Sequence, residues 1–567
     1  MNKTLLKSVR EYKKQSILAP LLVILEVLME VLIPLEMAKI IDVGIANGDM
    51  SYILQRGLIL VVMAMLALFF GVKAGNMAAI AGAGYARNLR HDIFYKVQDF
   101  SFKNIDHFST SGLVTRMTTD ITNIQMAYMM SIRLLARAPF MIILSWIMTL
   151  LLNKTISLLF LIVIPLLGGT LIYIAQKAHP HFIKVFDEYD VLNNSVQENV
   201  NASRVVKAFV REDYEIDKFH DISKYVYNLF TKAEKIVAWN SPVMQFTMYS
   251  VVLIMVLIGG KSIIAGTMET GELTSVIVYA LQIIGSLMMV TFVFVMIMIA
   301  EASSDRITEV MNEIPEMQDQ PDAVTEVPNG DIVFDHVDFS YAGEGGNLSL
   351  KNVNLHIESG QTIGIIGGTG SAKSSLVQLI PRLYDVTKGR VKVGGIDVRD
   401  YSLESLRDQV SMVLQKNVLF SGTIYENIRW GDEHASDEEV QRVCKLAQAD
   451  GFVQEFPNGY NTKIVQGGNN VSGGQKQRLC IARALLKKPK ILILDDSTSA
   501  VDTKTDALIR KAFREEIPNT TKIIIAQRVS SIEDADQIIV LDGGQIMGIG
   551  TSEELLKTNE IYREVYE

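Results

Sequence analysis

The sequence predicts a membrane-embedded all-α domain of six helices with long cytoplasmic helical extensions, followed by an α/β domain. Two observations carry this prediction. Of the 567 residues, 49% are hydrophobic and 21% are charged, which is more apolar than a soluble enzyme of this length would be. The apolar residues gather in long windows before Ala300, whereas short β-branched runs alternate with helical stretches after it. A soluble ATPase or any other wholly soluble protein is excluded.

Six apolar windows are long enough to cross the ~30 Å hydrocarbon core of a bilayer, which takes about 20 residues. They lie at Ile17–Ile41, Gly57–Ala78, Met129–Leu152, Ile156–Ala175, Pro242–Gly260 and Val276–Ala300. The first window is too long for a signal peptide and has no small-residue cleavage site, so we expect it to remain as an anchor.

Long connections follow the second and the fourth windows, and both have the pattern of helices rather than loops. In the later one, charged residues such as Glu198 and Lys207 alternate with Val200 and Val206 at helical spacing. Lysine and arginine gather in the leader and in these two connections. By the positive-inside rule the amino terminus, both long connections and everything after Ala300 are therefore cytoplasmic.

The composition changes after the sixth window. A proline-containing stretch with several carboxylates and no apolar period indicates a linker at 316–330, after a transmembrane domain at 1–315. In the remaining 331–567, strand-like runs alternate with helices, which predicts a largely parallel sheet. Those runs are Ile332–Phe334, Thr362–Ile366, Lys490–Leu494 and Lys522–Ile525.

The run Thr362–Ile366 leads directly into a glycine-rich turn and then a helix, the context in which a P-loop binds phosphate. Successive backbone N–H groups at a helix start form an anion site, a lysine reaches the β and γ phosphates, and a serine hydroxyl ligates Mg²⁺. The predicted ATP-binding residues of this turn are Gly367, Gly368, Thr369, Gly370, Ser371, Ala372, Lys373, Ser374 and Ser375.

One residue departs from the P-loop pattern, because Ala372 stands where a glycine normally precedes the lysine. On one interpretation alanine is tolerated because the position needs no positive φ. On the other, the alanine Cβ crowds the loop and slows the site.

A second phosphate-related feature is the buried-looking strand that ends in the carboxylate of Asp495. A carboxylate in this position beside a P-loop holds Mg²⁺ through its water shell. Between the two motifs lies Ser472, Gly473, Gly474 and Gln475, at the start of a helix. This is a second phosphate-binding helix end, and it implies face-to-face dimerisation with ATP between two such domains.

Together these motifs resemble one half of an ATP-binding cassette (ABC) exporter of the six-helix type, over essentially the whole chain. The resemblance implies that Ser472–Gln475 completes the ATP site of the opposite subunit and that Tyr341 stacks on adenine. It implies that Gln415 ligates Mg²⁺ and senses the γ-phosphate. Ser499, Ala500, Val501 and Asp502 match the loop that communicates across the dimer. The expected cofactors are ATP and Mg²⁺.

Two further positions depart from the family. Asp496 stands where a glutamate follows the strand carboxylate, and Gln527 stands where a histidine is expected. Aspartate is one methylene shorter, and a misplacement of about 1 Å can cost on the order of 100-fold in rate. Glutamine cannot carry a positive charge. We therefore predict a site that binds ATP and hydrolyses it poorly; the alternative is that both changes are neutral in a working ATPase.

By this resemblance the chain is most similar to the degenerate-site subunit of a heterodimeric bacterial multidrug exporter. A second half-transporter, the lipid bilayer and an amphipathic small-molecule cargo are the expected partners, and the bacterial cytoplasmic membrane is the expected location. A net charge of −9 gives no reason to expect nucleic acid. By family resemblance, the coupling helices would lie around Ser111–Asp120 and Val210–Asp217.

The acidic residues Glu26 and Glu30 lie in the first window, where charge is costly and usually faces a cavity or a partner. They are four residues apart and share a helix face. One interpretation is a cargo path that attracts cations; the other is a structural position at the membrane edge or against a partner.

Three other functions stay open from the sequence. The chain could be half of a lipid flippase or of a peptide exporter, or it could be a membrane ATPase that transmits a signal and transports nothing. An importer is disfavoured because the membrane windows are fused ahead of the ATPase domain.

Overall fold

The computed structural model describes residues 3–496 and 501–566, without the side chains of Lys3, Phe186, Asp187 and Asp190. It divides into two compact units. The first contains the chain up to Gln98 together with Ser109–Glu313, and the second contains Asp99–Phe108 together with the chain from Ile314 onward.

The first unit is entirely helical, and six of its helical stretches are long and apolar enough to span a membrane. Within the described residues these stretches are Thr4–Ile45, Met50–Gln98, Thr110–Leu152, Lys154–Val185, Glu212–Ile264 and Thr270–Asn312. The six-span prediction is confirmed, and each stretch extends beyond the apolar window that predicted it.

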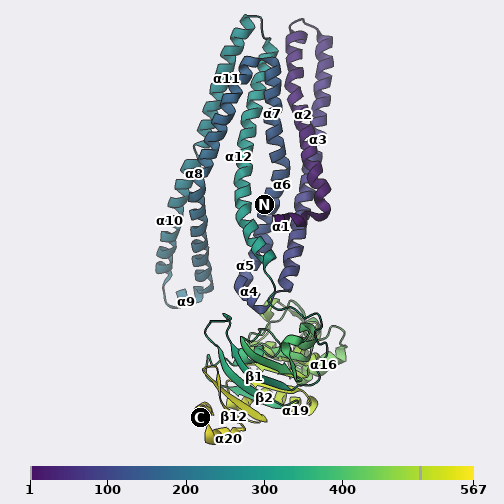
Figure 1. Cartoon of the computed structure of the whole chain (residues 1–567), viewed down its shortest axis with the longest axis vertical. Coiled ribbons are helices and arrows are strands. Elements are labelled where there is room, and N and C mark those ends of the chain that lie inside the picture. Colours follow the sequence, from purple (N-terminus) through teal and green to yellow (C-terminus); the bar gives the residue numbers. More distant parts are fainter. Residues whose placement is uncertain (1–2, 497–500, 567) are drawn as a thin grey trace. The chain divides into compact units, whose positions relative to one another are not determined.

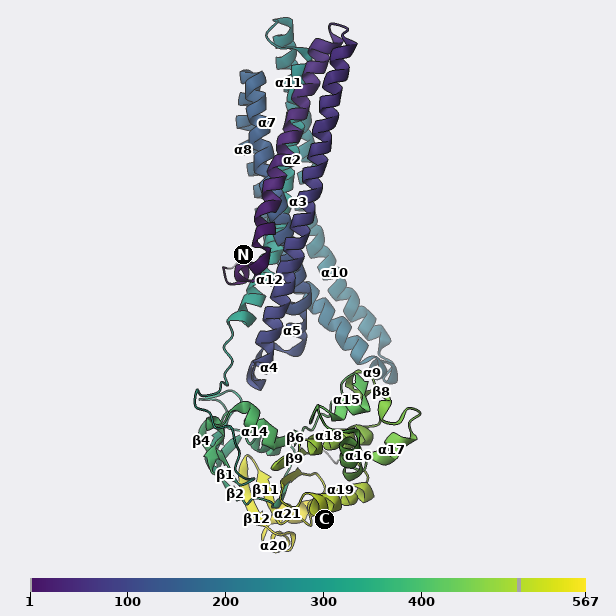
Figure 2. The same ribbon diagram turned by 90° about the vertical axis from the view of Figure 1, so that its right-hand side faces the viewer.

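The helices of the first unit follow one another with few true loops, since several turns of 3₁₀ or π-helix continue them. Their bounds are α1 Lys3–Leu6, α2 Lys13–Lys39, α3 Met50–Gln98, α5 Thr110–Thr115, α6 Ile121–Met130, α7 Ala136–Leu152, α8 Lys154–Asn201, α9 Ser203–Ala208, α10 Glu212–Val237, α11 Asn240–Ile264 and α12 Thr270–Asn312. In Figures 1 and 2, α2 lies along α3, and α8 lies along α10.

The second unit is the predicted α/β domain and carries two main sheets. A six-stranded sheet has the order β12-β11-β3-β10-β9-β6, and a four-stranded antiparallel sheet has the order β2-β1-β4-β5. The strands are β1 Ile332–Phe339, β2 Leu350–Ile357, β3 Thr362–Ile366, β4 Lys388–Val393, β5 Ile396–Asp397, β6 Val410–Val413, β7 Gly422–Thr423, β8 Lys463–Ile464, β9 Ile491–Asp495, β10 Thr521–Ile525, β11 Gln537–Asp542 and β12 Gln545–Gly550.

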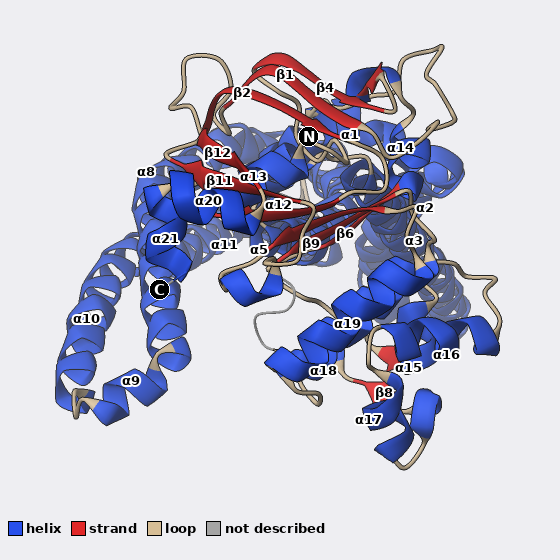
Figure 3. Ribbon diagram, turned by 90° about the horizontal axis from the view of Figure 1, so that it is seen from below, coloured by secondary structure: helices blue, strands red, loops and turns tan. Residues whose placement is uncertain are grey.

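Helices cover both faces of the six-stranded sheet, and a separate apolar core lies on each face (Figure 3). One core packs α13 between this sheet and the antiparallel sheet. The other core lies between the opposite face and the helices from α15 onward. The helices are α4 Phe102–Phe108, α13 Lys373–Gln378, α14 Leu403–Gln409, α15 Ile424–Ile428, α16 Asp437–Leu446, α17 Asp450–Glu455, α18 Gly473–Leu486, α19 Thr503–Glu516, α20 Ser552–Thr558 and α21 Glu560–Tyr566.

All four strand-like runs of the sequence are strands in the structure, with small shifts at their ends. One segment is grouped differently from the predicted domains. Residues 99–108 lie within the range assigned to the transmembrane domain, but they contact the α/β domain and form part of the second unit.

Candidate functional site

The predicted phosphate-binding residues lie at one edge of the six-stranded sheet. Strands β3, β10, β9 and β6 are parallel neighbours in this order, so their carboxyl ends meet at the same edge. The P-loop follows β3, and Gln527 follows β10. Asp495 ends β9, Asp496 comes directly after it, and Gln415 follows β6. Ligands of open α/β sheets bind at this edge, and the topology therefore brings these predicted residues together.

The turn after β3 needs glycine for two different physical reasons. A Cβ on Gly367 would lie 2.0 Å from the carbonyl oxygen of Leu541, so no side chain fits there. Gly370 has a φ of +83°, in the left-handed region that glycine adopts without strain. The turn is therefore packed closely against β11 at Gly367.

Lys373, the first residue of α13, folds back over this turn. Its Nζ donates hydrogen bonds to the carbonyl oxygens of Gly367 at 2.8 Å and Gly368 at 2.9 Å. Burial lowers the pKa of Lys373, while the charges of Asp496 and Asp495 act in the opposite direction. An ammonium in this position can exchange its carbonyl partners for phosphate oxygens, which are stronger acceptors because they are charged.

The structure corrects the interpretation that Ala372 needs no positive φ. Ala372 has a φ of 72° and a ψ of 24°, in the left-handed region. An L-residue there costs about 1–2 kcal/mol relative to right-handed backbone. Its methyl group packs against the core between the two sheets. This packing holds the methyl group without opening the turn.

Two of the residues expected to hold Mg²⁺, Ser374 and Asp495, meet at the start of α13, whereas the third, Gln415, hydrogen-bonds Asp496. The hydroxyl of Ser374 donates a hydrogen bond of 3.0 Å to Oδ1 of Asp495. Burial raises the pKa of Asp495, with Ser374 and Lys373 lowering it and Asp496 raising it further. A hydroxyl and a carboxylate oxygen, with the carboxylate of Asp496 nearby, are hard donors that fit Mg²⁺. Ser374 and Asp495 would hold it, and it would neutralise phosphate charge.

The two positions that depart from the family contact each other directly. Nε2 of Gln527 donates a hydrogen bond of 2.6 Å to Oδ2 of Asp496. Asp496 is buried, with 8% of its surface exposed. Burial raises the pKa of Asp496, and hydrogen bonds from Gln527 and Gln415 and the charge of Lys373 lower it in part. The carboxylate that would have to activate water is thus already engaged by two amides.

Tyr341, expected to stack on adenine, lies beside the P-loop helix. Its hydroxyl is 2.9 Å from Oγ of Ser375 and 3.3 Å from Oε1 of Gln378. The edges of Phe339 and Tyr384 pack against the ring. Since 44% of Tyr341 remains exposed, the ring has free surface for a flat partner.

The Ser472 motif begins α18 as a complete capping box. The hydroxyl of Ser472 accepts a hydrogen bond of 3.2 Å from the N–H of Gln475, and the Gln475 side chain accepts one of 2.9 Å from the N–H of Ser472. Ser472 and Gly473 are exposed. The 14-residue helix thus presents its positive end to the solvent, as anion binding requires.

The loop predicted to communicate across a dimer is described only in part. Ser499 and Ala500 lie outside the described residues. Val501 is buried, and the Asp502 side chain caps α19 by accepting a hydrogen bond of 2.9 Å from the N–H of Thr505.

In the first unit, Glu26 and Glu30 share a partner that the sequence interpretation missed. Arg137 of α7 forms ion pairs of 2.6 Å with Oε1 of Glu26 and 2.6 Å with Oε2 of Glu30. Glu26 lies against Gly71 of α3, where a Cβ would approach its carboxyl carbon to 3.0 Å. The two acids are therefore tied within this chain, which does not favour attraction of cations. Arg137 lies in the third apolar window. Because a cation inside such a window needs a partner, this arginine was the signal in the sequence from which the ion pairs could have been predicted.

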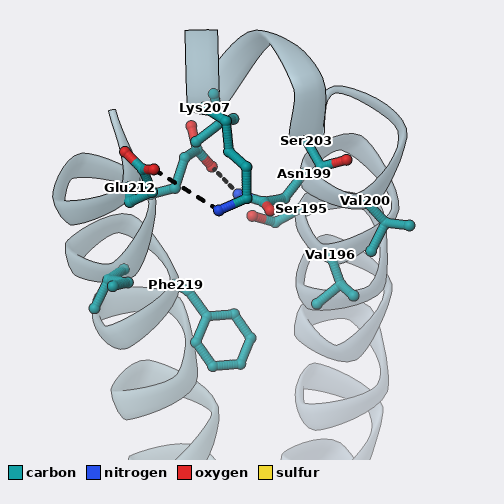
Figure 4. Close-up of a pocket in the computed structure, with 11 residues that line it drawn as sticks. Ser195, Val196, Asn199, Val200, Ser203, Lys207, Glu212 and Phe219 are labelled. Carbon is teal, nitrogen blue, oxygen red and sulfur yellow. Dashed lines mark hydrogen bonds and ion pairs between the residues drawn. The ribbon is translucent and has the colours of Figure 1, made fainter. Parts of the chain in front are cut away.

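The tip that joins α8 to α10 carries a cavity of about 520 Å³ (Figure 4). Two polar contacts close it: Lys207 to Glu212 at 3.9 Å and Asn199 to Glu215 at 3.0 Å. The ring of Phe219 lies between the two helices below them. The turn itself falls at α9 and the following three residues, so it starts earlier than the predicted Val210–Asp217.

Two family models match the chain, and they match its two halves. The model of the ABC transporter transmembrane region matches residues 16–287, and the ABC transporter model matches residues 350–499. An uncharacterised ABC transporter ATP-binding protein of Bacillus subtilis is 36% identical over 99% of this chain and 97% of its own length. The chain belongs to the ABC transporter family.

Other relatives place this ABC protein among exporters. An ATP-dependent lipid A-core flippase of Desulfotalea psychrophila is 33% identical over 88% of each chain. A solved bacterial Atm1-family ABC exporter with ATP bound has a TM-score of 0.85, with 25% identity over 98% of each chain. With one membrane unit and one ATPase unit, this ABC transporter is an exporter half-transporter, and it is an ATP-hydrolysing transporter.

Proposed function

We propose that this chain is one half of a heterodimeric ABC exporter that moves amphipathic small molecules across the bacterial cytoplasmic membrane. Its own P-loop binds ATP and hydrolyses it poorly. Its Ser472–Gln475 motif completes the active site on the P-loop of the partner half-transporter, where most hydrolysis takes place.

The observation that carries the proposal is the contact between Gln527 and Asp496. Hydrolysis needs a base or polarising group on the attacking water and a donor for the charge that develops on the γ-phosphate. Here the shorter carboxylate accepts a 2.6 Å hydrogen bond from the neutral amide that replaces the histidine. The two replaced side chains, Asp496 and Gln527, are thereby hydrogen-bonded to each other, so neither is free to act on water or on the phosphate.

The groups that only bind nucleotide are retained. Lys373 is placed to take phosphate oxygens, Ser374 and Asp495 are placed to hold Mg²⁺, and the ring of Tyr341 has exposed surface for adenine. Binding without rapid turnover would let the bound ATP act as a lasting link between the two ATPase units. Closure of those units would shift the membrane helices from inward-facing to outward-facing.

The turn between α8 and α10 is suited to transmit that closure. Two adjacent apolar side chains of this turn, Phe209 and Val210, are 74% and 81% exposed and so are open to contact. Val210 also has a φ of 52°, a strained value for a β-branched residue. By family resemblance this turn would dock on the partner's ATPase unit.

Lipids are a second candidate for the cargo. Two relatives are named for amphipathic lipids, the lipid A-core flippase and a fatty acid ABC transporter protein of Mycobacterium bovis that is 32% identical over 84% of this chain. Lipid A and fatty acids are anionic amphiphiles. Arg137 pairs with both Glu26 and Glu30, which makes these acids less available to a cationic cargo.

The proposal is tested by rebuilding the altered site. In the purified complex, the catalytic glutamate of the partner is replaced by glutamine, which should reduce ATPase activity to background. Asp496→Glu with Gln527→His in this chain should then restore activity about 10- to 100-fold above that background. The matched control is Asp322→Glu with Gln545→His, the same chemical changes at exposed positions. Full activity before rebuilding would contradict the proposal.

The cargo interpretation has its own test, with Glu26→Gln and Glu30→Gln assayed for uptake into inverted vesicles. We expect both variants to transport a cationic dye as well as the parent does, because both acids are already paired with Arg137 within this chain. A selective loss of cation transport, with lipid transport kept, would instead support a cation path.

A further inference from the structure

The helix α4, Phe102–Phe108, is built into the ATPase unit by several polar contacts. Asn104 accepts hydrogen bonds from the N–H of Ser101 at 3.1 Å and from the N–H of Glu316 at 3.3 Å, and donates one to the carbonyl of Ile314. Lys103 pairs with Glu316 at 2.5 Å. The chain leads directly from α3 into this helix, so a displacement of α4 acts on a membrane-spanning helix through covalent continuity.

A tyrosine that the sequence interpretation did not single out connects α4 to the rest of the unit. The hydroxyl of Tyr384 donates a hydrogen bond of 2.9 Å to Oδ2 of Asp106, and its ring lies 6.1 Å from that of Phe102. The ring is half-buried. Burial, with the Asp106 bond adding to it, raises the pKa of Tyr384, so the hydroxyl stays protonated and remains a donor.

The same ring contacts the residue expected to bind adenine. Tyr384 and Tyr341 form an edge-to-face pair with centroids 5.1 Å apart and planes at 88°. The hydroxyl of Tyr341 in turn lies 2.9 Å from Ser375 in the P-loop helix. A continuous series of contacts therefore runs from Asp106 through Tyr384 and Tyr341 to α13. Edge-to-face pairs depend on the relative orientation of the rings, so fixing one ring constrains the other.

We propose that Tyr384 is a positioning residue that couples docking of the adenine base on Tyr341 to the placement of α4. The base itself, and not the phosphates alone, then controls the segment that follows the second membrane helix. This inference rests on the assignment of Tyr341 to adenine, which belongs to the proposed function.

The test compares two ligands that fill the P-loop and differ in the base. The full chain in lipid nanodiscs is incubated with Mg²⁺ and either ATP or inorganic tripolyphosphate, and hydrogen exchange of the peptide 99–108 is measured by mass spectrometry. We expect ATP to slow exchange by about threefold or more, and tripolyphosphate to leave it unchanged at equal site occupancy. Equal protection by both ligands would overturn the proposed coupling through Tyr384.

Variants test the coupling through Tyr384 separately from the assignment of Tyr341 to adenine. Tyr384→Phe removes the bond to Asp106 and keeps the ring, and we expect it to abolish the ATP-dependent protection while ATP affinity changes less than about threefold. Asp106→Ala should do the same, and the double variant should add nothing further. The control Tyr401→Phe also removes one buried hydroxyl bond, to the carbonyl of Val393 at 2.9 Å, and should behave as the parent.

Tyr341→Ala completes the set, because it should weaken ATP binding about five- to tenfold and leave tripolyphosphate binding intact. Unchanged ATP binding in Tyr341→Ala would overturn the adenine assignment. Normal protection in Tyr384→Phe, together with weakened ATP binding in Tyr341→Ala, would overturn the coupling through Tyr384 and leave the adenine assignment standing.

Discussion

The ATPase unit has two phosphate-facing ends, and they differ in how fully they keep the residues of a working site. At the end formed by the Ser472–Gln475 motif, Ser472 and Gln475 form a complete capping box, and Gly473 between them is exposed. At the P-loop end, Asp496 and Gln527 differ from the family and bind each other, and both Ala372 and Asp496 have positive φ values of 72° and 49°.

The difference follows chemical roles. Lys373, Ser374 and Asp495, which would hold the nucleotide and its metal, are all present and converge. Asp496 and Gln527 stand at the positions that, by family resemblance, would act on water and on the phosphate being cleaved, and Ala372 is the one change within the phosphate-binding turn. Under the proposed function, this chain would serve the partner's site with its Ser472–Gln475 motif and only store ATP at its own.

The largest effect is expected from damaging the intact end. Gly474→Asp places a carboxylate where the signature faces the partner's γ-phosphate, and we expect a loss on the order of 100-fold in ATPase activity of the complex. An aspartate in the first turn favours the helix, so α18 should still fold. Gly451→Asp, the same change at an exposed glycine with open space around it, is the control. Unaltered activity in Gly474→Asp would contradict a role of the Ser472–Gln475 motif in hydrolysis.

The next effect concerns nucleotide binding at the altered end. Lys373→Ala removes a charged donor to phosphate, and we expect ATP affinity of this chain to fall about 30-fold in titrations with a fluorescent ATP analogue. Lys488→Ala, which breaks a surface pair with Glu439, should leave affinity unchanged. If the parent chain itself fails to bind the analogue, storage of ATP at this site is contradicted.

A smaller effect is expected from relieving the strained turn. Ala372→Gly should raise the thermal midpoint of the ATPase unit by about 1–3 °C, because glycine adopts the left-handed backbone without the alanine penalty and loses only part of this gain to chain entropy. Ala342→Gly, at an exposed loop alanine, should give no gain in the same fluorimetric melt. A lower midpoint for Ala372→Gly would show that the packed methyl group outweighs the strain.

The smallest effect is a pH dependence. Because burial raises the pKa of Asp496, its charged form is unfavourable in the folded chain, and this cost is present at neutral pH and lost as pH falls through the raised pKa. Asp496→Asn should therefore raise the nucleotide-free thermal midpoint by about 1–2 °C at pH 7.5. The gain should shrink as the pH of the buffer falls through the raised pKa. A gain that grows on acidification would reverse the assigned sign.

The sequence predicted what local patterns encode. Six apolar windows, the P-loop after β3 and the carboxylate that ends β9 each depend on residues close together in the chain, and the structure has all of them. The placement of Gln415 and Gln527 at the same sheet edge followed from family resemblance, and parallel strand order explains it.

What the sequence did not predict depends on distant contacts or on backbone conformation. Arg137 meets Glu26 across 111 residues, and Tyr384 meets Asp106 across 278. No periodicity specifies such pairs. The positive φ of Ala372 could not be predicted from its residue type, because alanine rarely adopts left-handed backbone.

The asymmetry of the two ATP sites is the central claim, and a single turnover of the complex tests it most directly. The complex is loaded with labelled photoreactive ATP, allowed one round of hydrolysis, and crosslinked, and the nucleotide on each chain is then identified. We predict that the partner's P-loop carries ADP while the P-loop of this chain still carries ATP. Equal conversion to ADP on both chains would contradict the account.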